Sequence, residues 1–183
     1  YKPEEVSTYE IGLRSDLWDR RVRLNATAFY SDYKDLQLQI NGSTVGTGGT
    51  VSPFNIVTNV PKARITGAEV ELVVVPAKGL RITSSLGLTN ARYVELPTDA
   101  KFIAANLINL SSQFPNTPKA SFTLGAVYTT RMTHDVDLTA RIDYAYKKTI
   151  YYDAPNSALL RQDPYGLVNA RLMFDLERFN TTL

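Results

Sequence analysis

Several residue types on which much protein chemistry depends are missing from this sequence, or nearly so. It has no cysteine, which excludes disulfide bonds and thiolate metal sites. Its single histidine, His134, falls in a predicted tight turn, where a Ser-His hydrolytic site is not expected. Asp32 and Asp35 lack the clustered oxygen ligands of a calcium loop. We therefore expect no catalytic residue, no metal site and no cofactor, and the chain is not predicted to be an enzyme.

Long hydrophobic runs and a strong charge of one sign are missing as well. The longest apolar stretch, Leu72–Ala77, is far short of the roughly 20 residues of a membrane helix. Twenty basic and 18 acidic residues give a net charge of +2, so no nucleic-acid partner is expected. The mean hydropathy of −0.18 still allows a membrane protein, because a barrel strand needs only about 10 residues with every second one apolar.

What the sequence does have is alternation of apolar and polar residues, with no convincing amphipathic helix. The alternation predicts an all-β chain, an antiparallel up-and-down meander of about seven long strands that forms a partial transmembrane β-barrel. Two of these strands are far longer than the usual five or six residues. The predicted strands are Val6–Trp18, Arg20–Ile40, Ala63–Val75, Leu80–Val94, Lys119–Arg131, Val136–Tyr152 and Tyr165–Leu176.

The predicted connections between strands alternate strictly between short and long. In a meander, this order places all tight turns at one rim of the sheet and all long loops at the other. Outer-membrane barrels show this sorting, with periplasmic turns and extracellular loops. The short connections are Trp18–Arg20, Pro76–Gly79 and Met132–Asp135, and the long ones are Asn41–Asn59, Pro97–Pro118 and Asp153–Pro164.

Alternation by itself leaves other classes open. A soluble sheet also alternates, with water on its polar side, so a soluble β-rich binding module and a passive outer-membrane porin remain as alternatives. On the polar side, we expect charged residues such as Arg14, Glu69, Glu71 and Arg141 to pair across strands or to be solvated in the lumen. On the apolar side, five tyrosines are expected in the aromatic girdle or facing lipid. These are Tyr30, Tyr93, Tyr128, Tyr144 and Tyr146.

An ordered series of short motifs resembles a known family. The first is the strand motif Tyr-Glu-x-Gly-x-Arg, and the others follow it in the same order as in that family. Together they resemble the later, C-terminal part of the barrel of TonB-dependent outer-membrane receptors of the siderophore-receptor type, and the resemblance covers nearly the whole chain. The motifs are Ser7–Arg14, Phe29–Gln37, Asn59–Glu71, Gly79–Leu80, Ala91–Tyr93 and Pro115–Lys119.

The resemblance implies a bacterial outer-membrane transporter for a scarce, bulky nutrient, typically a ferric siderophore, driven by TonB. A complete transporter barrel has about 22 strands, so residues 1–183 are expected to be an incomplete fragment of one barrel domain. The plug domain and the TonB box are absent from this sequence, and TonB would be a partner only through that plug. Outer-membrane lipid is the other implied partner. Tyr151, Tyr152 and Arg161, in or near a long loop, are the candidate contacts for an anionic, aromatic ligand.

Seven strands fall short of the eight of the smallest closed transmembrane barrel. An open sheet leaves two edges with unpaired backbone groups, which hydrocarbon cannot satisfy. We therefore expect the chain alone to form a curved open sheet. Its apolar face and edges would be covered by detergent or by self-association with another copy.

Overall fold

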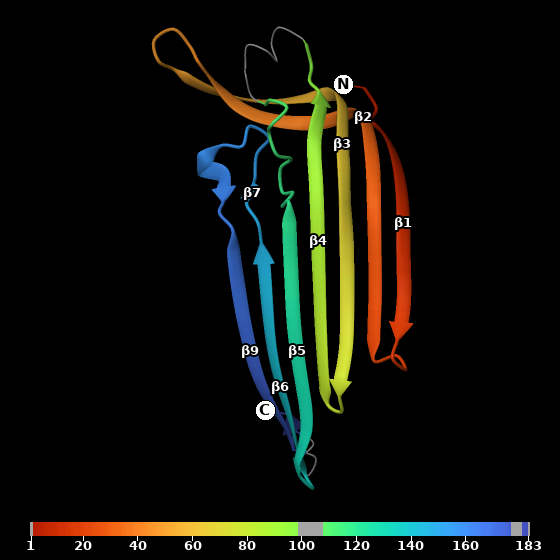
Figure 1. Cartoon of the computed structure of the whole chain (residues 1–183). Helices are drawn as coiled ribbons and strands as arrows, with labels where there is room; N and C mark the ends of the chain where they lie inside the picture. Colours follow the sequence, from red (N-terminus) through yellow and green to blue (C-terminus); the bar gives the residue numbers. More distant parts are fainter. Residues whose placement is uncertain (1, 99–107, 177–180, 183) are drawn as a thin grey trace.

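The computed structural model of the chain describes residues 2–98, 108–176 and 181–182, and most of them lie in one antiparallel sheet (Figure 1). Its strands follow one another in chain order, β1-β2-β3-β4-β5-β6-β9-β10, which confirms the predicted meander of about seven long strands. The strands are β1 (Glu5–Leu17), β2 (Val22–Val45), β3 (Val51–Ala77), β4 (Leu80–Glu95), β5 (Ala120–Thr133), β6 (Val136–Lys147), β9 (Tyr165–Leu176) and the two-residue β10 (Thr181–Thr182).

A small structured unit lies in the connection between β6 and β9. It consists of β7 (Ile150–Tyr151), β8 (Arg161–Gln162) and a 3-10 helix, Ala158–Leu160. β7 and β8 form a separate two-stranded sheet. The prediction of one strand from Val136 to Tyr152 was wrong here, because β6 ends at Lys147. Elements of two or three residues are too short for periodicity to reveal them.

Tight turns join the strands at one end of the sheet, at the bottom of Figure 1. Trp18, Asp19 and Arg20 all have positive φ angles, of 52°, 53° and 65°. Gly79 has a φ of 81°, and a β-carbon there would collide with the backbone oxygen of Thr129. Glycine is the residue that fits such a position without strain. His134 lies exposed in the turn between β5 and β6, as predicted.

The largest error of the sequence prediction is the loop expected at Asn41–Asn59. In the structure β2 and β3 continue through this segment as a paired hairpin, in register from Leu36 opposite Val60 to Val45 opposite Val51. A turn at 46–50 closes the hairpin. The glycines and polar residues suggested a loop, but valine and threonine there favour strands. Figure 1 shows this hairpin bending away from the line of the sheet at its upper end.

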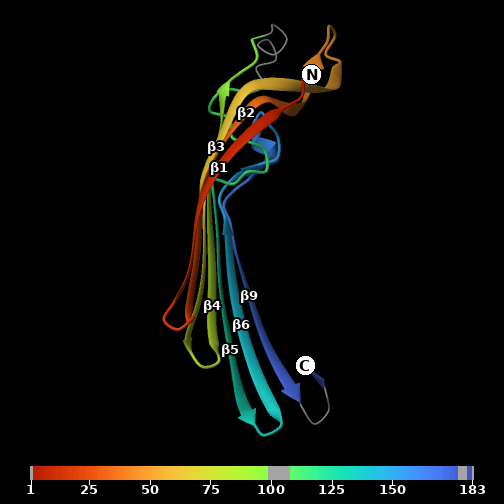
Figure 2. The same cartoon turned by 90° about the vertical axis from the view of Figure 1, so that its right-hand side faces the viewer.

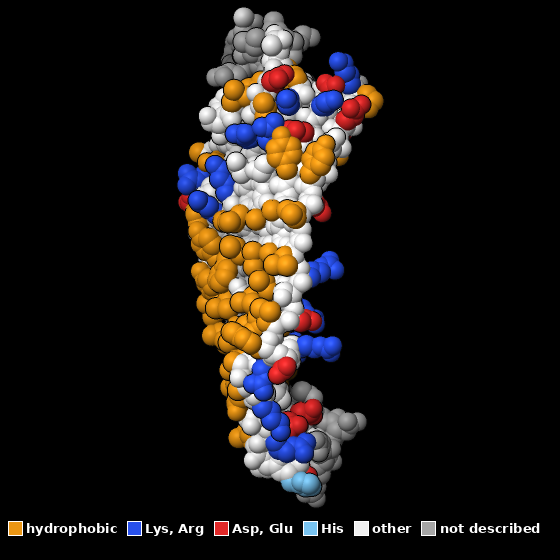
Figure 3. All heavy atoms as spheres, turned by 45° about the vertical axis from the view of Figure 1, so that its right-hand side comes forward, with side chains coloured by type: hydrophobic (Ala, Val, Ile, Leu, Met, Phe, Trp, Pro, Cys, Tyr) orange, Lys and Arg blue, Asp and Glu red, His pale blue; other side chains and the backbone are white. Residues whose placement is uncertain are grey.

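The two faces of the sheet differ in polarity along the lower part of the strands. Tyr9, Ile11 and Leu13 point to one side and are 57–77% exposed, which is far above what a soluble sheet leaves open. We call this side the outer face. Figure 3 shows its apolar side chains as a continuous band, with charged side chains above and below. The opposite side, the inner face, carries the alternating polar residues. Among the described residues, no helix is long and apolar enough to cross a membrane.

Among the described residues, a small apolar core lies at the loop end of the sheet. There the inner face of β2–β4 meets the loops that follow β4 and β6. Tyr93 is central to it, 2% exposed, and its ring stacks on Phe114 with centroids 4.5 Å apart. The prediction that Tyr93 faces lipid was therefore wrong, whereas Tyr128 and Tyr144 do lie on the exposed outer face. The core residues are Leu38, Val60, Ala63, Ala91, Tyr93, Ile108, Phe114 and Ala154.

The sheet is open. Among the described strands, β1 pairs only with β2, and β9 pairs with β6 and the short β10, so no ladder joins the two ends. Figure 2 shows the strands edge-on as a single bowed layer with the loops gathered over one end. This matches the predicted curved open sheet and explains why the strands have no core of their own.

Candidate functional site

The inner face of β1–β3 forms a polar hollow of about 940 Å³. The alternation of the strands places these side chains there, because every second residue points inward. The charged groups are four carboxylates and two guanidinium groups, so the hollow has a net negative charge. Its charged and polar side chains are Glu10, Arg14, Asp16, Arg23, Asn25, Thr27, Glu69 and Glu71.

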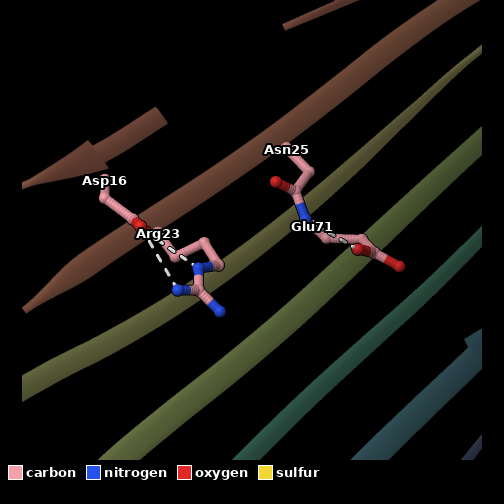
Figure 4. A network of polar contacts seen from close by, with 4 residues as sticks. All are labelled: Asp16, Arg23, Asn25 and Glu71. Carbon is pink, nitrogen blue, oxygen red and sulfur yellow. Dashed lines mark hydrogen bonds and ion pairs between the residues drawn. The ribbon is translucent and has the colours of Figure 1, made fainter. Parts of the chain in front are cut away.

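Two polar contacts cross between strands in this hollow (Figure 4). Arg23 on β2 donates from Nε to Oδ1 of Asp16 on β1 at 2.8 Å, and from Nη2 to Oδ2 at 3.2 Å. The two residues are direct cross-strand partners. Asn25 donates from Nδ2 to Oε2 of Glu71 on β3 at 3.2 Å. Exposed pairs of this kind contribute little stability, and their effect is to fix the orientation of the charged groups.

The four charged lumen residues named from the sequence have different environments. Glu71 accepts the hydrogen bond from Asn25. Arg141 pairs within its own strand, donating from Nε to Oδ2 of Asp143 at 2.6 Å, rather than across strands. For Arg14 and Glu69 the described part of the chain shows no ion pair, so these two charges face the hollow unpartnered.

The three candidate ligand contacts lie together at the loop end. Tyr151 on β7 is the direct partner of Arg161 on β8, so their side chains share one face of this small hairpin. Tyr152 follows, with its amide bonded to the carbonyl of Leu160 at 2.9 Å and its side chain 54% exposed. Arg161 also forms an ion pair with Asp163 at 2.6 Å. Tyr151 and Arg161 therefore lie on one face of this hairpin, and the exposed ring of Tyr152 lies next to them in the chain.

Sequence reasoning missed the residues that hold this hairpin in place. The side chain of Asn156 accepts a hydrogen bond from the amide of Gln113 at 2.6 Å and donates to the Gln113 carbonyl at 2.8 Å. Gln113 in turn donates to the carbonyls of Thr117 and Thr149, at 2.7 and 3.1 Å. These bonds join the two long loops into one unit. The available signal was Pro-Asn-Ser at 155–157, since asparagine tolerates the left-handed φ of 59° seen at Asn156.

Asp32 and Asp35 have different environments. Asp32 accepts hydrogen bonds from the Tyr30 hydroxyl at 2.7 Å and from Nε of Arg64 at 3.0 Å. Asp35 lies at a break in the β2–β3 ladder with a φ of 51°. No group of three or more potential metal-ligating side chains occurs in residues 2–98, 108–176 and 181–182.

These features together define a class of protein. A wall of long antiparallel strands, apolar outside, polar inside, with tight turns at one rim and long loops at the other, is the architecture of an outer-membrane barrel. The description "TonB dependent receptor-like, beta-barrel" matches residues 1–183. The chain therefore belongs to the TonB-dependent receptor β-barrel family and is part of a bacterial outer-membrane protein.

Solved structures show the same fold. The ferric yersiniabactin uptake receptor FyuA of Yersinia pestis is 23% identical over 93% of this chain, with a TM-score of 0.67. The siderophore receptor PiuA of Acinetobacter baumannii is 22% identical over 94%, with a TM-score of 0.66. The copper transporter OprC is 17% identical over 94%, with a TM-score of 0.65. The chain covers 22%, 22% and 23% of these proteins, so it corresponds to a fragment of a barrel.

The two alternative classes are not favoured. A soluble binding module would not leave Tyr9, Ile11 and Leu13 more than half exposed on one continuous band. The family match over the whole chain points to receptors rather than passive porins, and proteins of this family are transporters and not enzymes.

Proposed function

We propose that this chain forms part of the barrel wall of an active outer-membrane transporter that imports a ferric siderophore or a similarly bulky nutrient. The observation that carries the proposal is the match of all 183 residues to the TonB-dependent receptor barrel. FyuA is described as a ferric yersiniabactin uptake receptor and PiuA as a siderophore receptor, which supports the siderophore class. OprC is described as a copper transporter, so a substrate that contains a metal other than iron is the second candidate for the transported nutrient.

Residues 1–183 would act as a segment of a single barrel domain. In this proposal the plug, and with it the contact to TonB, comes from residues outside 1–183. Outer-membrane lipid covers the apolar band of the outer face, and the polar hollow faces the plug or the passing nutrient. The unpartnered charges of Arg14 and Glu69 would be available to groups that fill the barrel. No step of this function is chemical, so the chain is proposed to have no enzymatic activity.

Tyr151, Tyr152 and Arg161 are the proposed ligand contacts at the loop end. Phenol rings stack on catecholate or phenolate siderophores, and a guanidinium group pairs with their negative charge. The small β7–β8 sheet and the Asn156–Gln113 hydrogen bonds hold these side chains in a fixed arrangement. A preorganised contact loses less conformational entropy on binding than a flexible loop would.

The test is uptake by the full-length protein in a strain that lacks its own siderophore receptors. Uptake of radioactive iron bound to a panel of siderophores is measured with and without functional TonB. We expect saturable uptake of at least one complex that disappears without TonB. Uptake that persists without TonB and rises linearly with concentration would instead identify a passive porin.

The ligand contacts are tested in the same assay. Arg161→Gln and Tyr152→Ala are expected to raise the half-saturating concentration about 10-fold each, since a charge-assisted bond or an aromatic contact contributes roughly 1–3 kcal/mol. Lys78→Gln, at the opposite rim, is the matched control. If the half-saturating concentration were unchanged in both loop variants, these residues would not be ligand contacts. The proposal of transport would be unaffected.

A further inference from the structure

Cationic side chains collect on the outer face immediately beyond the apolar band. Lys34 and Lys62 are direct cross-strand partners on β2 and β3, and Arg64 and Arg92 are direct partners on β3 and β4. Arg64 and Arg92 alternate with the inward-facing core residues Ala63 and Tyr93, so they point outward. Lys34 and Lys62 lie next to them, where the β2–β3 ladder skips Asp35 and Pro61. Figure 3 shows charged side chains along this upper border of the band.

Two like-charged pairs in direct register are an unfavourable arrangement for a sheet. Like charges directly opposite each other destabilise an antiparallel pair, and here two such pairs lie next to each other along β3. The local acidic groups remove only part of this cost. Asp32 is already engaged by Arg64 and Tyr30, and for Arg92 no acidic partner occurs among the described residues. Glu5 and Glu95 lie opposite Lys34 and Lys62 in register, but no ion pair joins them in this part of the chain.

The position of these cations relative to the membrane follows from their neighbours. The Arg64 guanidinium lies 5.1 Å from the centroid of the Tyr30 ring, and the Tyr30 ring contacts Tyr9 with centroids 6.5 Å apart. Paired tyrosines at the edge of an apolar band mark the level of the lipid headgroups. The cations therefore sit at headgroup level on the loop side of the barrel, which is the extracellular side.

An apolar groove of about 460 Å³ lies on the same face directly below the tyrosines. It exists because small residues on β2 and β3 stand beside large residues on β1. Ala68 at the groove is four residues from Arg64 along β3, which is a distance of about 13 Å. A molecule with an acyl chain in the groove would carry its polar head among the cations. The apolar side chains that line the groove are Ile11, Leu13, Ala26, Ala28, Ala68 and Val70.

We propose that Lys34, Lys62, Arg64 and Arg92, with the groove below them, bind one acylated, phosphate-bearing lipid of the outer leaflet. The phosphate lies between these cross-strand cation pairs and offsets their mutual repulsion. The guanidinium groups of Arg64 and Arg92 can each donate two parallel N–H bonds to it. The acyl chain fills the groove. A lipid fits better than a soluble anion, because the site faces the membrane and continues into an apolar surface.

The test uses the full-length protein in a zwitterionic detergent, with binding of purified diphosphorylated lipid A followed by native mass spectrometry. Lys62→Gln combined with Arg92→Gln is expected to weaken binding roughly 30-fold, from about 1 kcal/mol per cation near a lipid surface. Arg171 on β9 is the direct partner of the inner-face residue Arg141 on β6. Arg14→Gln combined with Arg171→Gln therefore removes the same charge from the inner face and is expected to leave lipid binding unchanged.

Two further binding measurements identify the molecule that carries the phosphate. Dephosphorylated lipid A is expected to bind as weakly to the wild-type protein as the intact lipid does to the outer-face variant. Inorganic phosphate at millimolar concentration is not expected to displace the lipid, because it has no acyl chain for the groove. Equal binding of intact and dephosphorylated lipid, or equal losses in the outer-face and inner-face variants, would overturn the proposal. Displacement of the lipid by inorganic phosphate alone would also contradict the proposal, because it would show that the site binds anions in general.

Discussion

At the residue scale, Tyr93 shows how strongly position in the fold sets the properties of a side chain. Its neighbour Arg92 points outward to the headgroup level, whereas Tyr93 is buried under the loops with its ring on Phe114. Its hydroxyl is the one buried side-chain polar atom without a hydrogen-bond partner in the described part of the chain. Burial disfavours the phenolate and raises the pKa of Tyr93 to about 12.

The raised pKa of Tyr93 predicts a specific loss of stability in alkali. A group whose pKa is higher in the folded state stabilises the fold fully below its unfolded pKa, which is about 10 for tyrosine. That contribution is lost as the pH rises from about 10 through about 12. The difference in ultraviolet absorbance between the wild-type protein and Tyr93→Phe should show one tyrosine ionising near pH 12. A difference titration centred near 10 would contradict the burial of this hydroxyl.

At the element scale, the tight turns fix the register of the strands that they join. The turn at Gly79 shows this. The backbone oxygen of Thr129 on β5 lies so close to Gly79 that a β-carbon would not fit. The amide of Thr129 also donates to the Gly79 carbonyl at 2.9 Å, which ties the β3–β4 turn to β5. A change at this position therefore affects three strands, and a one-residue slip would turn apolar side chains from lipid toward the lumen.

Gly79→Ala is expected to destabilise the full-length barrel by roughly 1–3 kcal/mol, the cost of a strained backbone position, with the clash against Thr129 adding to it. Urea unfolding in detergent would measure the loss. Gly48→Ala is the matched control, because Gly48 also has a positive φ, of 99°, but has no atom within 4 Å of the added carbon. An equal loss in both variants would show that the clash contributes nothing.

At the scale of the whole molecule, the sheet is a wall with two open ends and one exposed apolar face. β3 alone has 27 residues, which at about 3.3 Å each span about 90 Å, so much of it projects beyond a hydrocarbon core of about 30 Å. The projecting part bends inward and buries the core under the loops. Among the residues that the structure describes, the lower part has no such cover, so lipid, detergent or other strands must supply it.

Residues 1–183 expressed alone are therefore expected to associate in detergent through their open edges. Light scattering coupled to size-exclusion chromatography should give dimers or larger species. Ile11→Lys, on the edge strand β1, is expected to reduce the association more than Leu86→Lys on the central strand β4, because charged side chains on an edge block pairing. A monomer with native strand content, or equal effects of both variants, would show that the edges are not responsible.

Much of this fold is predictable from the sequence because a period of two is a direct signal. The segment Tyr165–Leu176 alternates cleanly and forms β9 with those bounds. The segment 41–59 was mispredicted as a loop, since its glycines and other polar residues outweighed its valines and threonines, and pairing along the whole hairpin decides it instead. For the candidate site, Tyr151, Tyr152 and Arg161 were named from the sequence, but their placement on one small hairpin depends on hydrogen bonds from Asn156 that periodicity cannot reveal.

The sequence by itself determined the all-β class, the meander order, the polarity of the two faces and the family. These follow from local alternation and turn residues, which act over a few positions. Only the tertiary structure decided that Tyr93 is buried, that the two long loops form one unit, and that Lys62 and Arg64 stand in register with Lys34 and Arg92. The reason is physical: burial and register depend on which strands and loops meet, and those contacts join residues far apart in the chain.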